Sequence, residues 1–291
     1  MAARGSPGLS RNKMKHLSTL ALLLLLFAGS ARADRPIWTK DTTALERIET
    51  QDEKRIRRLH LVHFNLSADV PATDTVLRPA VTRWMDGLLG AQLGNGAGQT
   101  GADAAETARR YEKQFVDGAR REVKELLKAR GKDDPEARIT YTYDLALRRV
   151  YETDRFVTFR AEAYTYTGGA HGMQYVAYGT FVKADGRLLT WDDIVSPKRK
   201  TRFRALVADA LMGYFGVQSF DAMKEKLLVD DQCTRSTFPL PEGAPGLLDD
   251  GLHVQYADYE IAPHAAGMPG VTITYDQMKG FWTPYAVKIW R

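Results

Sequence analysis

The pattern of apolar and polar positions changes period along the chain. Alternation over residues 57–68 is typical of a strand. Within 76–89 and again within 103–130, apolar residues recur at spacings of three and four, which predicts two helices with one core-facing stripe each. A glycine-rich loop at 90–102 separates these helices, and the glycine and proline of 131–135 end the second one.

The middle of the chain returns to a period of two. Residues 139–147 and 157–163 alternate on either side of a turn at 152–154, which predicts an antiparallel pair, and a third strand follows at 174–183. The remaining elements are a turn at Asp185-Gly186, a helix at 203–215 and late strands at 252–256 and 271–275. Because strands and helices fall in separate blocks, we expect an α+β fold, an antiparallel sheet with helices packed mainly on one face.

The first 33 residues differ in character from the rest. Leu17 to Ala28 is an apolar run that follows Lys13 and Lys15 and precedes Ala31-Arg32-Ala33, the pattern of a signal peptide. The run is shorter than the roughly 20 residues of a membrane span. We therefore expect a periplasmic or secreted protein with no membrane anchor after cleavage. The expected parts are a signal peptide (1–33), an irregular segment (34–54), an N-terminal strand with helices (55–135) and a C-terminal domain (136–291).

Charge and cysteine content narrow the function classes. Of the 41 Lys and Arg residues, five lie in 1–33, so the remainder carries 36 basic against 36 acidic residues and has a formal charge of zero. Nucleic-acid binding, which depends on a cationic surface, is therefore not expected. Cys233 is the only cysteine, so no internal disulfide can form. We expect it to behave as a small buried apolar residue.

Three local motifs are of types that can bind a cofactor or a metal, but each has a better structural explanation. The GxGxxG match at 96–101 follows a helix, whereas dinucleotide binding requires a preceding strand. The sequence TWDD at 190–193 resembles a polysaccharide deacetylase motif, but no H-x-x-x-H pair accompanies it, and a helix capping box explains it. His60 and His63 would point to opposite faces of a strand. We therefore predict no cofactor and no metal.

Two stretches have unusual local chemistry. In the first, Glu162, Tyr164 and Tyr166 share one strand face and lead into Gly168, Gly169 and His171. In the second, Tyr259 and Glu260 precede a turn that contains His264. Either the two histidines fix turns by bonding backbone carbonyls, or the stretches form a binding surface. The candidate binding residues are Tyr164, Tyr166, Gly168, Gly169, His171, Tyr259 and His264. A catalytic alternative uses His171 as base or ligand with Glu162 or Glu260.

The same stretches carry a family resemblance. YTGGAHG at 166–172, LLTWDDIV at 188–195 and GLHVQYADYEIAPHAAGMPGVTITYDQM at 251–278 resemble the RsiV-like family. That family includes the extracytoplasmic domain of the lysozyme-sensing anti-sigma-V factor and the non-catalytic domain of PdaC-type peptidoglycan deacetylases. The resemblance runs from about residue 138 to 282 and more weakly back to 55. It implies a cell-envelope module, in one relative a receptor for lysozyme and in another an accessory to an enzyme acting on glycan.

These observations favour a cell-envelope binding protein without catalysis, whose partner is a lysozyme-like wall hydrolase or peptidoglycan glycan. Two alternatives stay open. One is a peptidoglycan-modifying hydrolase or deacetylase that uses His171. The other is an immunity protein that blocks a delivered toxin.

Overall fold

The computed structural model describes residues 42–57, 60–94, 103–130 and 140–290, all of which belong to one compact unit, 34–291. The expected signal peptide and the GxGxxG match at 96–101 lie outside the described residues. Among the described helices, none has the length and apolar character that crossing a membrane requires.

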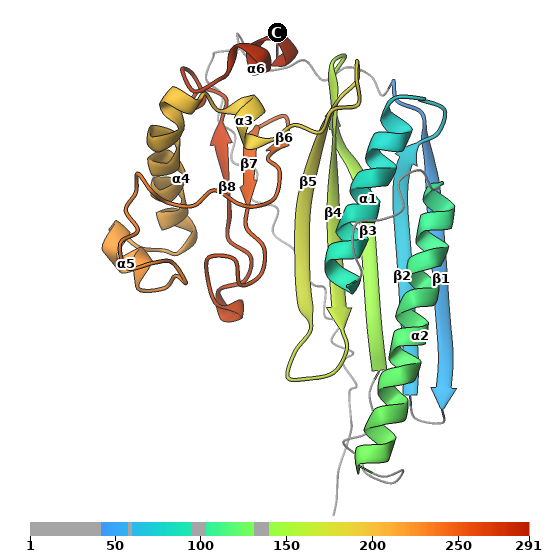
Figure 1. The fold of residues 1–291 in the computed structure, drawn as a ribbon. Helices are drawn as coiled ribbons and strands as arrows, with labels where there is room; N and C mark the ends of the chain where they lie inside the picture. The colour runs from blue at the N-terminus through green and yellow to red at the C-terminus, as the bar shows by residue number, and fades with distance from the viewer. Residues whose placement is uncertain (1–41, 58–59, 95–102, 131–139, 291) are drawn as a thin grey trace, which may run out of the picture. The chain divides into compact units, whose positions relative to one another are not determined.

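The larger of two sheets has five strands in chain order (Figure 1). They are β1 (Leu45–Arg57), β2 (His60–Pro71), β3 (Thr140–Glu152), β4 (Phe156–Tyr166) and β5 (Met173–Val182). All neighbours pair antiparallel except β2 and β3, which are parallel. Strands β2 and β3 can be parallel because two helices connect them. These helices return the chain to the end of the sheet at which β2 begins.

The strand β1 corrects the expectation that 34–54 is irregular. Residues 45–57 pair along β2, although eight of these thirteen residues are charged. Ile48 is buried in the core, whereas Glu46, Arg47 and Glu49 are exposed. An edge strand of this composition lacks the apolar alternation from which a strand is recognised, and its charges protect the edge from pairing with other chains.

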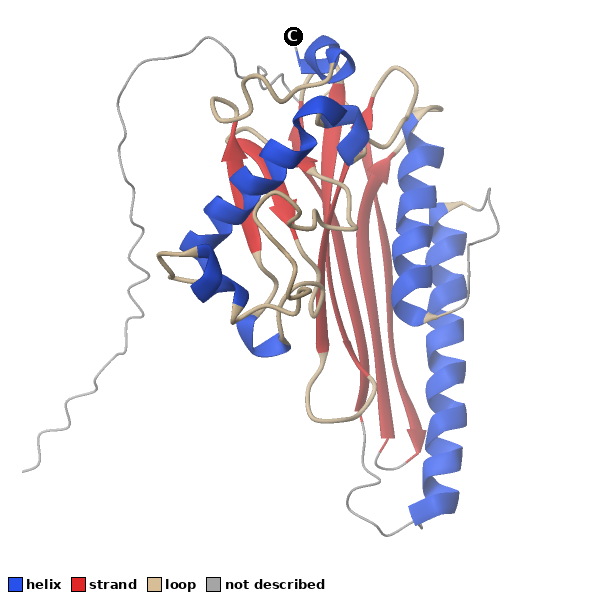
Figure 2. Ribbon diagram, turned by 60° about the vertical axis from the view of Figure 1, so that its left-hand side comes forward, coloured by secondary structure: helices blue, strands red, loops and turns tan. Residues whose placement is uncertain are grey.

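Helices α1 (Leu77–Leu93) and α2 (Ala104–Arg130) cover one face of this sheet, as Figure 2 shows. Their apolar stripes pack on side chains that alternate along the strands, and Phe64, Phe115 and Tyr143 form an aromatic centre with ring centroids 5.3–6.0 Å apart. The helices near 76–89 and 103–130 and the α+β class were predicted correctly, since a long apolar stripe identifies a helix reliably.

The C-terminal elements build a second core beside a three-stranded sheet, β6 (Gly246–Leu247), β7 (Gly251–Gln255) and β8 (Gly270–Thr274). Its helices are α3 (Trp191–Ile194), α4 (Lys200–Tyr214), α5 (Phe220–Lys224) and α6 (Pro284–Trp290). The segments Pro197–Arg199 and His264–Ala266 are short 3₁₀ helices. The predicted capping box is present at the start of α3, where Asp193 Oδ2 accepts hydrogen bonds from the Thr190 backbone and hydroxyl.

Strand β6 packs on the face of β4 and β5 that α1 and α2 leave open. A buried threonine pair makes the junction: Thr158 Oγ1 donates to the Leu247 carbonyl at 2.7 Å, and Leu247 N donates to Thr180 Oγ1 at 3.1 Å. At Gly246, an added Cβ would lie 2.6 Å from the Tyr178 ring, so only glycine allows this approach. The C-terminal elements are thereby fixed against the large sheet.

Candidate functional site

The hairpin between β4 and β5 presents the first of the two stretches. Gly168 and Gly169 have φ values of 101° and 108°, which side chains rarely adopt. The Tyr166 hydroxyl donates to the Gly169 carbonyl at 3.1 Å and closes the turn. At Gly172, an added Cβ would lie 2.4 Å from the Tyr164 ring, so this ring lies directly over the glycine. The glycines thus shape the turn, and Tyr166 stabilises it.

The two stretches meet through their histidines. The rings of His171 and His264 stack with centroids 3.9 Å apart and an angle of 9° between their planes. His171 Nδ1 lies 3.0 Å from the Gly172 carbonyl oxygen, and a carbonyl can only accept, so Nδ1 carries the proton in this bond. The Tyr259 hydroxyl lies 3.4 Å from His171 Nε2, the other ring nitrogen. His171 therefore both fixes its turn and contacts the second stretch.

A buried carboxylate orients the second histidine. Asp258 Oδ2 lies 2.7 Å from His264 Nδ1, and the Asp258 side chain is only 3% exposed. Its other oxygen, Oδ1, is buried without a hydrogen-bond partner among the described residues. A carboxylate on Nδ1 selects the tautomer and ring orientation of a histidine, as acid–histidine pairs do in enzymes and metal sites. Sequence reasoning missed Asp258, since a single aspartate before a turn is an ordinary feature.

Tyr259 completes a stack of three rings, which we call the ring cluster (His171, Tyr259 and His264). Its ring lies 5.8 Å from that of His264 and 6.4 Å from that of His171, with angles of 21° and 24°. Tyr259 is the only non-glycine residue with positive φ in the described part of the chain, at 64°, and the residue is 45% exposed. A left-handed conformation costs an ordinary residue roughly 1–2 kcal/mol. The structure tolerates this cost at an exposed aromatic residue.

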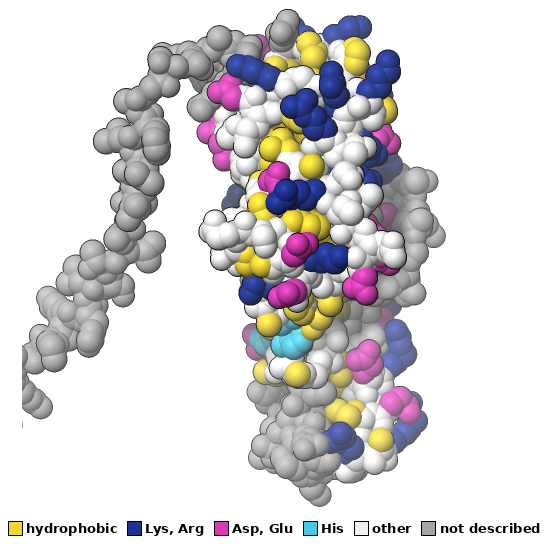
Figure 3. Space-filling model, turned by 90° about the vertical axis from the view of Figure 1, so that its left-hand side faces the viewer, with side chains coloured by type: hydrophobic (Ala, Val, Ile, Leu, Met, Phe, Trp, Pro, Cys, Tyr) yellow, Lys and Arg dark blue, Asp and Glu magenta, His cyan; other side chains and the backbone are white. Residues whose placement is uncertain are grey.

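The ring cluster lies within a wider exposed apolar patch. Three of the six large apolar side chains that are exposed in the described residues belong to it, and we call them the apolar patch (Tyr164, Tyr214 and Tyr259). The Tyr164 ring lies over Gly172, next to His171, and the Tyr214 hydroxyl donates to the Ala266 carbonyl at 2.8 Å. Figure 3, which faces the C-terminal elements, shows histidine side chains reaching the surface beside apolar ones.

The carboxylates of the catalytic alternative have other partners. Glu162 forms an ion pair with Arg160 at 2.5 Å. Glu260 accepts from the backbone nitrogens of Glu242 and Ala257 at 2.7 and 2.6 Å, so it holds two loop segments together. The acid that the structure brings to the histidines is Asp258 instead.

Within the described ranges, no group of three or more His, Cys, Asp or Glu side chains is placed to hold a metal ion. Cys233 is partly buried, and burial raises the pKa of its thiol, which opposes the formation of a reactive thiolate.

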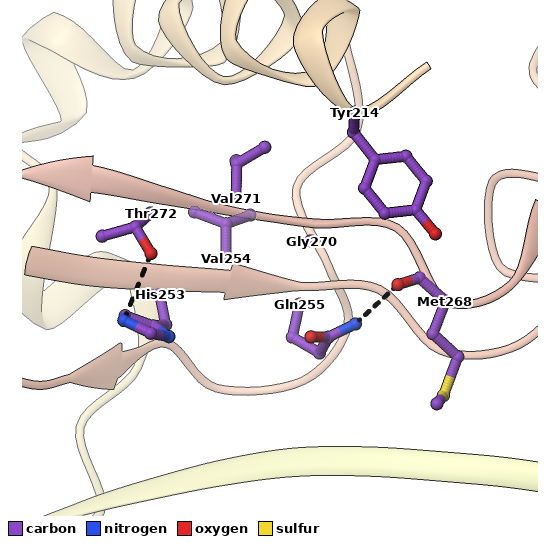
Figure 4. A pocket seen from close by; sticks show the side chains of 8 residues that line it. All are labelled: Tyr214, His253, Val254, Gln255, Met268, Gly270, Val271 and Thr272. Carbon is purple, nitrogen blue, oxygen red and sulfur yellow. Dashed lines mark hydrogen bonds between the residues drawn. The ribbon is translucent and has the colours of Figure 1, made fainter. Parts of the chain in front are cut away.

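A pocket of about 290 Å³ lies beside the apolar patch and shares Tyr214 with it (Figure 4). Its polar side chains are tied to neighbours. His253 Nε2 lies 2.8 Å from Asp250 Oδ1 and 3.2 Å from Thr272 Oγ1, and Gln255 Nε2 donates to the Met268 carbonyl at 3.1 Å. The other lining residues are Val254, Gly270 and Val271. Hydrogen bonds therefore fix the polar side chains of this pocket, which lies next to the apolar patch.

Two family models match different parts of the chain. The model described as deacetylase PdaC matches residues 97–174, and the protein family of unknown function DUF3298 matches residues 192–276. His171 belongs to the first segment, whereas Tyr259 and His264 belong to the second, so the ring cluster lies where the two segments meet. No curated protein matches the chain.

Solved structures of DUF3298 proteins share this fold. One from Bacteroides fragilis is 21% identical with a TM-score of 0.66, and the match covers 85% of this chain and 97% of that one. Another, from Pseudomonas aeruginosa, is 20% identical with a TM-score of 0.59 and coverages of 84% and 97%. The chain therefore contains one segment that matches the PdaC model and one that matches the DUF3298 model, within a fold that solved DUF3298 structures share.

Proposed function

We propose that this protein is a cell-envelope binding protein, without catalysis, that recognises a lysozyme-like wall hydrolase through the ring cluster and the apolar patch. The observation that carries the proposal is Tyr259. It is an exposed aromatic residue, held in a strained backbone conformation and stacked on two histidines from both family segments. Local strain is retained mainly at functional sites, where the surrounding structure compensates for it.

The extent of the apolar patch favours a protein partner over a single sugar ring. Its three side chains come from β4, α4 and the loop after β7, and one of them, Tyr259, belongs to the ring cluster. Tyrosines are enriched among the residues that dominate protein–protein binding, because they bury much area and lose little rotamer entropy. The resemblance to a lysozyme receptor supplies the class of partner, and the PdaC and DUF3298 matches are compatible with an envelope role.

A calorimetric titration of the purified protein with hen egg-white lysozyme tests the proposal, with soluble peptidoglycan fragments as a second titrant. We expect saturable binding of lysozyme that Tyr259→Ala weakens by at least about tenfold, the effect of a typical hot-spot residue. Val76→Ala is the matched control, since Val76 is also a large apolar residue that is exposed but lies at the start of α1 beside Gly186, beyond the other end of β5. Binding of the glycan fragments alone, or of neither titrant, would contradict the proposal.

The Asp258–His264 pair favours a second candidate, the hydrolysis or deacetylation of wall glycan. A carboxylate on Nδ1 leaves the opposite ring nitrogen of His264 able to act as a general base. Turnover of N-acetylated peptidoglycan fragments, lost in His264→Ala, would support this activity. No turnover by the unmodified protein, with or without added zinc, would remove it.

A further inference from the structure

We infer that the outer edge of β5 accepts an extended segment of a partner protein as an additional strand. This inference rests on the proposed function in taking the partner to be a protein. The outward-facing backbone groups of β5 would bind the partner segment.

The edge strands of the large sheet differ in how they are protected. Edge strands expose unpaired backbone groups, and proteins usually protect them with charges, prolines or bulges. At one edge, β1 carries eight charged residues and an irregular register between Arg55 and Arg57. At the other edge, β5 has the sequence MQYVAYGTFV, with no charge and no proline, and its register with β4 is regular throughout. The β5 edge therefore lacks the common devices that prevent pairing.

The hydrogen bonds at the end of β5 show which backbone groups face outward. On the side away from β4, Val182 N donates to the Arg187 carbonyl and Leu189 N donates to the Thr180 carbonyl, each at 2.9 Å. Backbone groups in a regular strand alternate between its two sides. The N–H and C=O groups of Gln174 and Val176 therefore point outward as well. No backbone bond to them from another element occurs among the described residues.

The free part of this edge is short. Arg187 and Leu189 occupy the outer side of Val182 and Thr180, and β6 packs on Tyr178. The accessible part is therefore the first half of the strand, where Gln174 is exposed and Val176 is half-buried. A second copy aligned antiparallel would bring its own hairpin against the occupied positions. A flexible segment of about five residues has no such constraint and pairs by strand addition.

The position of the edge fits this role. The free half of β5 begins at Met173, directly after the hairpin that carries His171. Side chains of an added strand would reach the patch, while its backbone would bind Gln174 and Val176. The patch supplies specificity and the edge supplies hydrogen bonds, which is the division of roles in strand addition. The partner segment is extended and uncharged, because β5 offers no charge for it to pair with.

The test uses an uncharged nine-residue peptide of alternating threonine and valine with a serine at each end and blocked termini, and the same peptide with N-methylated valines as control. Amide hydrogen exchange of the full chain is measured with each peptide at saturation. We expect the first peptide to slow exchange at Gln174 and Val176 at least about tenfold, because outward amides gain a bond. The N-methylated peptide should have no effect. Amide exchange that slows equally along β1, or that does not slow at β5, would overturn the inference.

Two proline variants separate edge binding from folding. Val176→Pro removes an outward N–H and leaves the β4 pairing intact, as proline is tolerated at strand edges. We expect it to fold and to lose peptide binding. Ala177→Pro removes an N–H that faces β4 and should destabilise the hairpin instead. A concentration-dependent dimer that Val176→Pro abolishes would assign the edge to a second copy and overturn the inference. If lysozyme binds and Val176→Pro does not weaken it, the edge inference fails while the proposed function stands.

Discussion

The imidazole rings of His171 and His264 lie face to face at 3.9 Å, and this contact joins the β4–β5 hairpin to the loop after β7. The first ring is fixed by the Gly172 carbonyl and the second by the buried Asp258 carboxylate. Neither ring can therefore turn without breaking a hydrogen bond. The contact forms a stiff connection between the two family segments at the surface where binding is proposed.

The histidine stack should be measurable as an energetic coupling. We expect His171→Ala and His264→Ala to be non-additive in the free energy of unfolding, with a coupling of about 0.5–1.5 kcal/mol, the range for stacked rings. Urea unfolding at pH 8 of both single variants and the double variant gives this value. Coupling below the error of the cycle would show that the stack contributes nothing. A cycle of His171→Ala with Val76→Ala, residues not in contact, provides the additive control.

Tyr259 allows folding and binding to be separated. We expect Tyr259→Asn to change the free energy of unfolding by less than about 1 kcal/mol, because asparagine tolerates positive φ and the relieved strain offsets the lost ring contacts. Lysozyme binding should fall at least about tenfold in the same variant. Tyr259→Phe keeps the ring and is the matched control, with binding close to that of the unmodified protein. Unchanged lysozyme binding by Tyr259→Asn would assign the residue to the fold alone.

The periodic elements of the fold could be predicted from the sequence, and the edge strand could not. Apolar residues recur with a helical period over several turns of α2 and with a period of two along β3 and β4. The local sequence is therefore enough to identify each as a helix or a strand. Strand β1 gains its conformation from pairing with β2, which its charged sequence does not reveal. The parallel pairing of β2 and β3 likewise depends on how α1 and α2, which connect these strands in sequence, pack across the face of the sheet.

For the candidate site, the sequence indicated the residue types but not their contacts. The glycines beside His171 and the turn at His264 mark unusual backbone in each stretch separately. Their meeting depends on β6 seating against Thr158 and Thr180, which is a property of tertiary packing. Asp258 has no local signal at all, because its role exists only once His264 turns back toward it.

The packing of β6 on the large sheet predicts a stability effect at Gly246. We expect Gly246→Ala to lower the free energy of unfolding by about 1–3 kcal/mol, since the new Cβ would lie 2.6 Å from the buried Tyr178 ring near its attachment to the backbone. Gly213→Ala is the control. Gly213 lies within α4 with no atom within 4 Å of an added Cβ, so alanine should stabilise by roughly 0.5–1 kcal/mol. Thermal unfolding of both variants checks the opposite signs.

The buried Glu152 should make the fold sensitive to acid. Its carboxylate has no exposed surface and binds Arg149 at 2.8 Å as well as Lys183. Burial raises the pKa of Glu152, but hydrogen bonds from Lys183 and from two threonines, Thr43 and Thr42, outweigh this and lower the pKa to about 2. Because the folded pKa lies below the unfolded value of about 4.3, the stabilisation is complete above pH 5 and is lost as the pH falls toward 2.

Replacing this carboxylate should remove that pH dependence. We expect Glu152→Gln to lower the free energy of unfolding at pH 7 by about 3–5 kcal/mol, because it removes the buried negative charge that Arg149 and Lys183 both contact. The difference between the variant and the unmodified protein should shrink between pH 4 and pH 2, where the unmodified protein loses the same charge. Urea unfolding at pH 7, 4 and 3 measures it. Asp117→Asn, at a half-buried position on α2 whose carboxylate pairs with Lys113 and Arg120, is the control and should change stability far less than Glu152→Gln. A difference for Glu152→Gln that stays constant from pH 7 to pH 3 would show that the Glu152 carboxylate is not the group responsible.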